Sequence, residues 1–249
     1  MLGCAGYAAY EVAEQPTNQV FGAAVSAGPA SQRVVALTFD DGPNPPYTDA
    51  ILAVLEQEHV QATFFLVGRA VAAYPAIVQR EARDNDALGN HSWDHAHLIV
   101  MTPATLKRSL QRTDAAIAAA TGLHPRIMRP PFGARDWEVM QTARKSGYTV
   151  VMWSVPLARD WENPPPQVIA QRILGRVADG SIIVLHDGNQ GRLCAKWNLA
   201  PSVCDRSADV DATREIVRAL KKRGYRFVTI PQLMAMPARV KRRHALATR

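Results

Sequence analysis

The sequence predicts an α/β fold built on a parallel sheet. Short apolar runs rich in β-forming residues alternate with stretches of helical spacing, and Gly or Pro residues mark the boundaries between them. This alternation favours parallel pairing, because parallel strands need a crossover connection that is usually a helix. In such folds the loops at the carboxyl ends of the strands hold the chemistry. The length of 249 residues is compatible with one large α/β barrel or with two small domains.

Six strands and six helices are expected. The predicted strands cover residues 34–39, 62–67, 127–129, 149–153, 181–186 and 226–230. The predicted helices cover residues 48–58, 75–84, 103–121, 136–146, 166–178 and 209–223. Thr102 followed by Pro103 is typical of a helix start, and Gly122, Gly147 and Gly224 stand where helices should end.

Three segments are expected along the chain. Residues 1–30 are rich in Ala, Gly and Ser without a sustained period, which predicts an extension or linker. The folded domain is expected over residues 31–236, followed by a basic tail over residues 237–249. The net charge of +7 favours anionic surroundings, but basic residues do not alternate with aromatic ones as in nucleic-acid platforms. We therefore expect no nucleic-acid partner. The protein is expected to be a monomer that binds a polysaccharide substrate.

The cysteines and the N-terminus leave alternatives open. A run of about 18 apolar residues is absent from the sequence, so no membrane span is expected. Residues 1–5 resemble the end of a bacterial lipoprotein signal, which would make Cys4 a lipid anchor, although a chance occurrence is the favoured interpretation. Cys194 and Cys204 bracket a short segment and predict either a disulfide in an oxidising compartment or two free thiols.

Two adjacent carboxylates end the first predicted strand. Asp40 and Asp41 are followed by Gly42 and Pro43, and such a turn allows both side chains to reach one pocket if the strand ends there. Taken alone, the same residues are also typical of a turn whose acids cap backbone amides.

A histidine pair supplies the second cluster. His91 and His95 are four residues apart, a spacing that places both imidazoles on one face of a helical turn, as in zinc-binding pairs. With one carboxylate they make a ligand set that leaves positions open for water and substrate. His97 is a weaker competitor because it is offset by two residues from His95.

Two further motifs follow predicted strands. Arg129 precedes two prolines and Phe132, and the rigid loop suits a backbone amide aimed at a developing oxyanion, while Arg129 could pair with a carboxylate. His186 ends a buried-strand pattern and is suited to act as a general acid. Trp153 and Trp161 lie between these motifs and could stack on sugar rings, although large aromatic residues are more often in the core.

Taken together, these motifs resemble the polysaccharide deacetylases of carbohydrate esterase family four, which share the NodB homology domain. The resemblance covers residues 33–234 and depends on the order of Thr38 to Pro43, His91-x-x-x-His95, the Arg-Pro-Pro loop and Leu185-His186-Asp187. It implies a distorted (β/α) TIM-like barrel with fewer than eight full strands. It also implies a hydrolase of linear amides that removes N-acetyl groups from an N-acetylglucosamine polysaccharide and releases acetate.

The resemblance also implies roles for individual residues. Asp41, His91 and His95 are expected to hold a divalent metal, usually Zn²⁺, with Co²⁺ or Ni²⁺ as alternatives. Asp40 is expected to be the general base, Arg129 to orient it, and His186 to be the general acid. The oxyanion and substrate contacts are expected from Phe132, Pro131, Trp161, Asp160 and Leu185.

The chain departs from the family pattern at two positions. Phe132 replaces the usual Tyr, which matters little if the oxyanion contact comes from the backbone. Leu157 occupies the place of an aspartate that tunes the general acid, so a substitute partner for His186 has to be found elsewhere.

Three questions about function stay open at this point. An O-deacetylase of acetylated xylan and a catalytically weakened carbohydrate-binding relative are the alternatives to an N-deacetylase. Peptidoglycan is favoured over chitin as the polymer because the chain is basic. The expected location is extracytoplasmic, which covers secreted, periplasmic and envelope-associated proteins.

Overall fold

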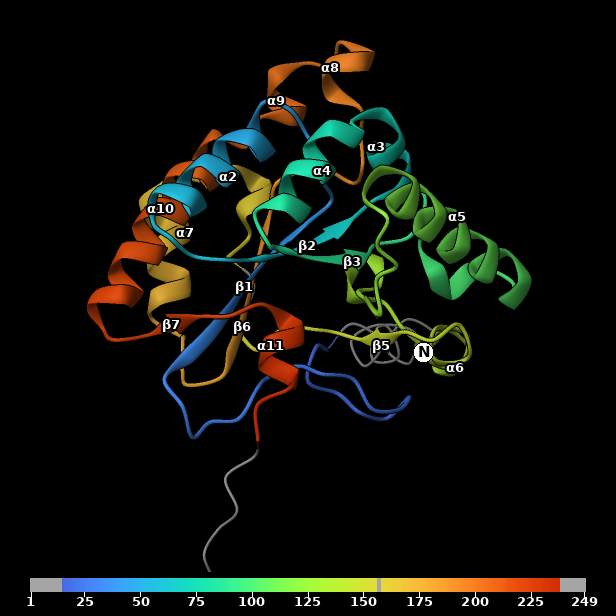
Figure 1. The fold of residues 1–249 in the computed structure, drawn as a ribbon, viewed down its shortest axis with the longest axis horizontal. Coiled ribbons are helices and arrows are strands. Elements are labelled where there is room, and N and C mark those ends of the chain that lie inside the picture. The colour runs from blue at the N-terminus through green and yellow to red at the C-terminus, as the bar shows by residue number, and fades with distance from the viewer. Residues whose placement is uncertain (1–14, 156–157, 238–249) are drawn as a thin grey trace, which may run out of the picture.

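A seven-stranded parallel sheet organises the chain (Figure 1). The computed structural model describes residues 15–155 and 158–237. The strands are hydrogen-bonded in the order β5-β4-β3-β2-β1-β6, and β7 pairs with the start of β1. Their bounds are β1 Val34–Asp40, β2 Thr63–Leu66, β3 Ala87–Asn90, β4 Ile127–Met128, β5 Thr149–Val150, β6 Ser181–His186 and β7 Arg226–Phe227.

The six predicted strands are confirmed, and β3 was not predicted. Its sequence, Ala-Leu-Gly-Asn, contains no β-branched or aromatic residue and therefore carries no β signal. Gly89 is needed here because a Cβ at this position would lie 2.4 Å from a ring carbon of Phe65 on the neighbouring strand. Close packing between the strands thus requires a glycine at this position, and glycine gives no β-strand signal in the sequence.

Helices cover the sheet on two flanks (Figure 1), with α2, α7 and α10 packed together on one and α3, α4 and α5 on the other. The longer helices are α2 Tyr47–Gln57, α4 Pro75–Arg83, α5 Pro103–Thr121, α6 Trp137–Lys145, α7 Pro166–Leu174 and α10 Ser207–Lys222. The short helices α3 Gly68–Ala73, α8 Cys194–Trp197, α9 Pro201–Cys204 and α11 Ile230–Met234 were not predicted.

The predicted helix boundaries are confirmed where the sequence carried a physical signal. Thr102 caps α5 by accepting a hydrogen bond from the Thr105 amide, and Pro103 is its first residue. Gly122, Gly147 and Gly224 have φ angles of 76°, 85° and 80°, the left-handed conformation in which glycine avoids the Cβ clash.

Alternation along the strands divides the core into two parts. On β1, Val35, Leu37 and Phe39 pack outward against the helices. Val34 and Ala36 pack on the opposite face, in a second cluster that fills the interior of the curved sheet. A side chain's position along a strand therefore decides whether it points at the helices or into the interior.

The sheet forms a distorted barrel whose wall is irregular between β5 and β6. Val25 forms a parallel bridge with Val151 beyond the end of β5, and Ala27 forms an antiparallel bridge with Ser181 at the start of β6. Further along, the Ser154 amide donates to the Ile182 carbonyl at 3.1 Å. Residues 25 and 27 belong to the segment predicted as an extension, so this part of it contributes to the wall.

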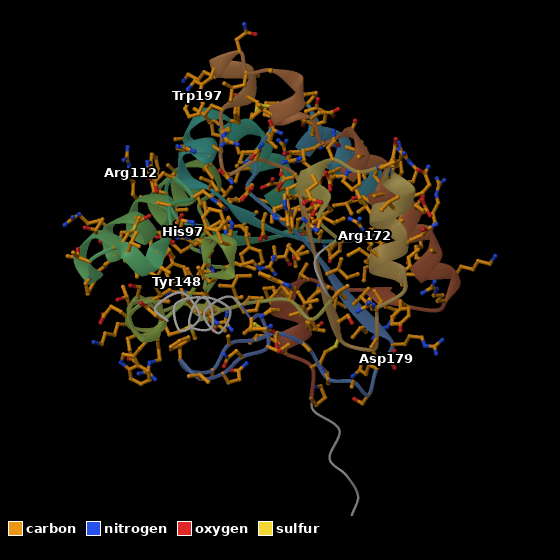
Figure 2. All side chains as sticks on the ribbon, turned by 180° about the vertical axis from the view of Figure 1, so that it is seen from behind. His97, Arg112, Tyr148, Arg172, Asp179 and Trp197 are labelled. Atoms are coloured by element: carbon orange, nitrogen blue, oxygen red, sulfur yellow. A yellow bond between two sulfur atoms is a disulfide. The ribbon has the colours of Figure 1, made fainter. Side chains whose placement is uncertain are left out.

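Cys194 and Cys204 form a disulfide, which decides between the two alternatives left by the sequence. The bond ties α8 to α9 in the connection between β6 and α10. Trp197 lies exposed at the outer end of this connection (Figure 2). Among the described residues, no helix combines the length and apolar character needed to cross a bilayer. Cys4 and residues 238–249 lie outside the described part of the chain.

Leu37→Ala is expected to lower the free energy of unfolding by about 3 kcal/mol, because the side chain is fully buried and leaves a cavity. Denaturant titration of both proteins measures this difference. Leu123→Ala is the matched control, since Leu123 is 50% exposed and its loss should cost less than about 0.5 kcal/mol. Equal losses for the two variants would contradict the proposed position of the core.

Candidate active site

Asp40 and His186 end adjacent strands and point into the same space. They are register partners in the parallel pair of β1 and β6. Asp40 lies an even number of residues from Val34 and Ala36, which face the interior, and His186 stands in the same relation to Val184. The carboxyl ends of two neighbouring strands thus deliver a carboxylate and an imidazole to the mouth of the barrel.

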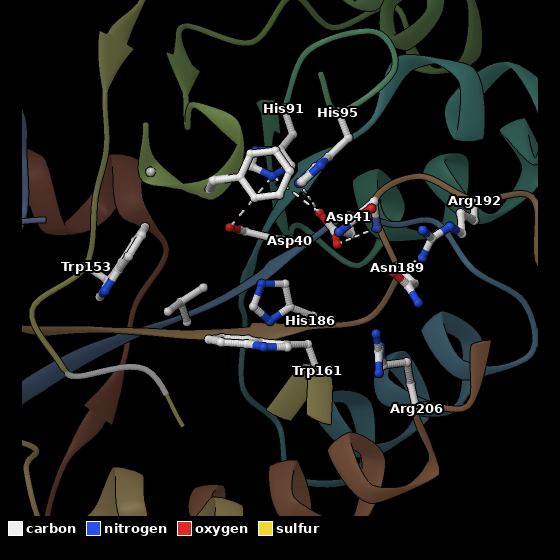
Figure 3. Close-up of a pocket in the computed structure, with 14 residues that line it drawn as sticks. Asp40, Asp41, His91, His95, Trp153, Trp161, His186, Asn189, Arg192 and Arg206 are labelled. Carbon is white, nitrogen blue, oxygen red and sulfur yellow. Dashed lines mark hydrogen bonds and ion pairs between the residues drawn. The ribbon is translucent and has the colours of Figure 1, made fainter. Parts of the chain in front are cut away.

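These residues line a cavity of about 470 Å³ at that mouth (Figure 3). The predicted residues that line it are Asp40, Asp41, His91, His95, Phe132, Trp153, Trp161 and His186. Side chains that the sequence analysis did not single out complete the wall: Val184, Asn189, Gln190, Arg192 and Arg206, with Gly133. Three of the six, Asn189, Gln190 and Arg192, closely follow β6, and for these three this position in the chain was the signal that could have found them.

Asp41 faces both imidazoles of the predicted pair. Its Oδ1 lies 3.0 Å from His95 Nε2 and 3.4 Å from His91 Nε2, while its Oδ2 accepts a hydrogen bond from the Gln190 amide at 2.6 Å. Burial by itself raises the pKa of Asp41, but the two imidazoles outweigh burial and hold that pKa well below its usual range.

One oxygen and two ring nitrogens therefore converge at a single point. Ligand atoms of Asp41, His91 and His95 all lie within 4.8 Å of one another, and all three residues are buried. His91 Nδ1–H donates to the Arg129 carbonyl oxygen at 2.8 Å, so Nε2 is the ring nitrogen that faces Asp41. Nitrogen and carboxylate donors of this kind suit Zn²⁺ and similar divalent metals, so the donor set fits such an ion.

The histidine pair does not lie on a helix, and this part of the prediction was wrong. The two residues belong to an irregular loop that follows β3. Ser92 and His95 have φ angles of 68° and 58°, so the backbone turns away from a helical path. Asp41 is also left-handed, with φ of 81°. Non-glycine residues in this conformation are strained and cluster at functional sites.

Arg129 is fully buried and bonded to Asp40. Its Nη1 donates to Asp40 Oδ1 at 2.6 Å and to Thr38 Oγ1 at 2.8 Å, as the predicted pairing requires. Nε and Nη2 donate to the carbonyl oxygens of Val151 and Met152 at 3.2 and 3.0 Å. The guanidinium therefore fixes one oxygen of Asp40, and Asp40 Oδ2 is left facing the cavity, 4.0 Å from His91 Nε2.

His186 is paired with Asp160, the partner that the sequence left unidentified. Nδ1 of His186 donates to Asp160 Oδ2 at 2.8 Å, and the His186 amide donates to the same oxygen at 2.8 Å. Burial lowers the pKa of His186, but the Asp160 carboxylate outweighs it and raises that pKa to about 10. Leu157, which occupies the place of the aspartate that was expected to tune His186, lies outside the described residues.

The remaining predicted residues occupy different positions. Phe132 is left-handed with φ of 61°, and its ring packs edge-on to His95 and stacks on His97. Trp161 packs edge-on to His186 with ring centroids 5.5 Å apart. Leu185 does not line the cavity, because alternation along β6 sends it outward into the helix-facing core.

Asp160 and Pro131, both expected near substrate, are buried and are not among the lining residues. Asp160 instead lies behind His186. His97 is likewise outside the convergent ligand group.

Comparison with known proteins identifies relatives of this chain. The polysaccharide deacetylase family model matches residues 27–151. A peptidoglycan-N-acetylglucosamine deacetylase of Bacillus cereus is 33% identical over 207 residues, which cover 83% of this chain and 90% of the relative. A chitooligosaccharide deacetylase of Bradyrhizobium sp. is 36% identical over 205 residues, which cover 81% of this chain and 90% of the relative.

The solved structures extend the likeness to the fold. A CE4 family pseudoenzyme from Bacillus anthracis has a TM-score of 0.76 at 28% identity, and the match covers 88% of this chain and 70% of that one. Since a pseudoenzyme has this fold, catalysis has to be inferred from the arrangement of the side chains at the site and not from the fold. By its sequence and its fold, this chain belongs to the polysaccharide deacetylase family.

Proposed function

We propose that this protein is a metal-dependent hydrolase that removes N-acetyl groups from an N-acetylglucosamine polysaccharide and releases acetate. The observation that carries the proposal is the arrangement of Asp40 beside a convergent ligand group, with the His186 and Asp160 pair on the adjacent strand. The names of the relatives, a peptidoglycan and a chitooligosaccharide deacetylase, support the substrate class. Peptidoglycan is the polymer we favour.

Asp41, His91 and His95 would hold the metal, and we propose Zn²⁺, with Co²⁺ or Ni²⁺ able to replace it. When bound, the ion would polarise the acetyl carbonyl and make water a stronger nucleophile. The chain supports this role by holding the His91 ring through the Arg129 carbonyl, so that Nε2 is the atom presented. The left-handed backbone at Asp41 and His95 turns their side chains toward the same point.

Asp40 is the proposed general base. Arg129 occupies Oδ1, so Oδ2 is the oxygen available to take a proton from the attacking water. Four donor contacts hold the guanidinium itself in place, which fixes the carboxylate without a mobile element. As water adds to the acetyl carbon, its proton passes to Asp40, and negative charge develops on the former carbonyl oxygen. We propose that the Phe132 amide donates to this oxygen.

His186 is the proposed general acid. Its Nδ1 is engaged by Asp160, so Nε2–H is the proton available to the sugar nitrogen as the carbon–nitrogen bond breaks. With a pKa of about 10, His186 carries this proton throughout the neutral range. Cleavage then leaves acetate and a free amine on the sugar. His186 and its partner Asp160 are both present, which argues against the alternative of a carbohydrate-binding protein that has lost catalysis.

An extracytoplasmic location is part of the proposal. The Cys194–Cys204 disulfide supports it, because such bonds persist in oxidising compartments and are rare in the cytosol. A polymer of the cell envelope would also be encountered there.

Acetate release from peptidoglycan, chitin oligomers and acetylxylan tests the function directly. The protein is stripped with a chelator and assayed before and after Zn²⁺ is added back. We expect release from the two N-acetylated polymers only, and only with metal. Release from acetylxylan alone would replace the proposal with O-deacetylation, and release from none of the three would refute it.

Asp40→Asn is expected to reduce acetate release by about 10²–10⁴-fold, because an amide cannot accept the proton. Initial rates at saturating Zn²⁺ measure the loss. Asp49→Asn is the matched control, since the Asp49 carboxylate is 44% exposed on α2 and should leave the rate unchanged. An Asp40→Asn protein as fast as its parent would show that another group is the base.

His91→Ala and His95→Ala are each expected to weaken Zn²⁺ binding by about a hundredfold or more, because each removes a ligand atom. His97→Ala should leave the affinity unchanged, since His97 lies outside the ligand group. Calorimetric titration of metal-free protein measures all three. A loss in His97→Ala as large as in the other two would mean that the ligand set is wrongly assigned.

Asp160→Asn is expected to move the basic limb of the kcat profile to lower pH. Asp160 is the main cause that raises the pKa of His186 from 6.5 to about 10, whereas burial lowers it. Without the carboxylate only burial and weaker charges remain, so the general acid loses its proton at lower pH. Profiles of both proteins measured to high pH check this sign, and an unmoved basic limb would contradict the role of Asp160.

A further inference from the structure

A second carboxyl group lies behind the His186 and Asp160 pair. Asp209, in the first turn of α10, is fully buried and within hydrogen-bond reach of Asp160, which is also fully buried. Asp160 Oδ1 and both oxygens of Asp209 find no N–H or O–H donor among the described residues. Two carboxylates are both acceptors, so they can bond to each other only if one of them carries a proton.

Burial makes two ionised carboxylates at this position too costly. Like charges in contact away from water push one of the two groups to its neutral form, as in sites where two carboxyls share one proton. Arg206 is the arginine whose charge would favour an ionised Asp209. Its Nε donates to the Gly188 carbonyl at 2.7 Å and its Nη1 to the Asp205 carbonyl at 3.2 Å, so these hydrogens are not directed at Asp209.

The surrounding contacts decide which carboxyl holds the proton. Asp160 Oδ2 accepts two N–H groups of His186, and the charge of that imidazole favours an ionised Asp160. Asp209 has no donor of this kind. Consistently, burial and the neighbouring Asp160 raise the pKa of Asp209 well above its usual range, against opposing effects of Arg206 and His186. For Asp160, burial raises the pKa but His186 outweighs it.

We propose that Asp209 is a neutral positioning residue whose carboxylic O–H donates to Asp160 Oδ1, so that Asp160 stays ionised with Oδ2 held against His186. Each oxygen of Asp160 then has its own donor, one from α10 and one from the general acid. The role that the hydrogen-bonded series Asp209, Asp160 and His186 plays in catalysis rests on the proposed function of His186 as general acid. The location of the proton does not depend on that role.

The test uses two substitutions at Asp209. Asp209→Asn keeps a donor of the same shape that cannot ionise, and Asp209→Leu removes the donor at similar volume. Asp211→Asn is the control on the same helix, because the Asp211 side chain is 62% exposed and paired with Arg214. Acetate release over a range of pH, infrared spectra and the proton resonance of His186 Nδ1–H are measured for all proteins.

Infrared spectroscopy at neutral pH locates the proton directly. The parent minus Asp209→Asn difference should contain the carbonyl band of a protonated carboxylic acid, and the parent minus Asp211→Asn difference should not. This comparison is needed because Glu81 is another buried acid whose pKa burial raises well above its usual range. A difference spectrum for Asp209→Asn without an acid band would overturn the proposal.

The positioning role has its own measurement. The low-field His186 Nδ1–H resonance should keep its position in Asp209→Asn and move upfield in Asp209→Leu. In the same variant kcat should fall about tenfold or more with little change in KM, the size expected for one lost hydrogen bond to a charged group. Asp209→Asn should restore kcat to within about threefold of the parent.

Equal behaviour of Asp209→Asn and Asp209→Leu in resonance and kcat would overturn the proposed donor role. Should Asp209→Leu not fold, the infrared difference for Asp209→Asn still decides whether Asp209 carries the proton, and a changed His186 resonance in Asp209→Asn would contradict the donor role. If the parent protein releases no acetate from any polymer, the proposed function fails. The two spectroscopic results would nevertheless still support or refute a neutral Asp209.

Discussion

The buried ion pair of Arg129 and Asp40 is the interaction on which the site depends. Arg129 is fully buried, so its charge is tolerable only because Asp40 and three oxygen acceptors surround it. Removing one partner of such a pair leaves an uncompensated charge and typically costs about 3–5 kcal/mol. Its guanidinium also lies 4.2 Å from the Phe65 ring centre. The residue that holds the proposed base therefore also connects β1 to the segment that follows β5.

Arg129 also connects groups with different roles. Its side chain fixes Asp40 and reaches the carbonyls that follow β5, while its backbone carbonyl receives the proton of His91 Nδ1. Arg129 thus orients both His91, a proposed metal ligand, and Asp40, the proposed base. On the adjacent strand, Asp160 performs the comparable task for His186. Two buried charged pairs therefore orient the proposed base and the proposed general acid, while the loop after β3 supplies His91 and His95.

Much of this could be predicted because the signals were local. Alternating strand and helix patterns identified six of the seven strands, and the ends of β1 and β6 identified Asp40, Asp41 and His186. Counting residues along β6 would also have excluded Leu185, since every second side chain faces the helices. The spacing of His91 and His95 correctly predicted that the two imidazoles lie together, but it predicted the wrong backbone, because left-handed residues can also bring the two rings together.

The rest could not be predicted because it depends on contacts between distant segments. Asp160 meets His186 across 26 residues, and Asp209 reaches the same pair from a helix later in the chain. Asp160 was expected near substrate rather than behind His186, and Asp209 has no local sequence feature that distinguishes it from other acidic residues. Likewise, Gly89 contributes no strand signal to the sequence, whereas its absent side chain is what allows β3 to pack against Phe65. Such positions become interpretable only when the neighbouring strand is known.

The two-residue repeat along β1 has a consequence for how related chains can diverge. Inserting or deleting one residue before Asp40 would rotate it to the helix-facing side and expose Leu37 or Phe39 to the barrel mouth. Length changes within this strand are therefore incompatible with the site, whereas loops beyond the strand ends tolerate them. Across evolution, differences in chain length should accumulate in segments such as residues 187–206. Variation there would remodel the entrance while the strand ends keep their register.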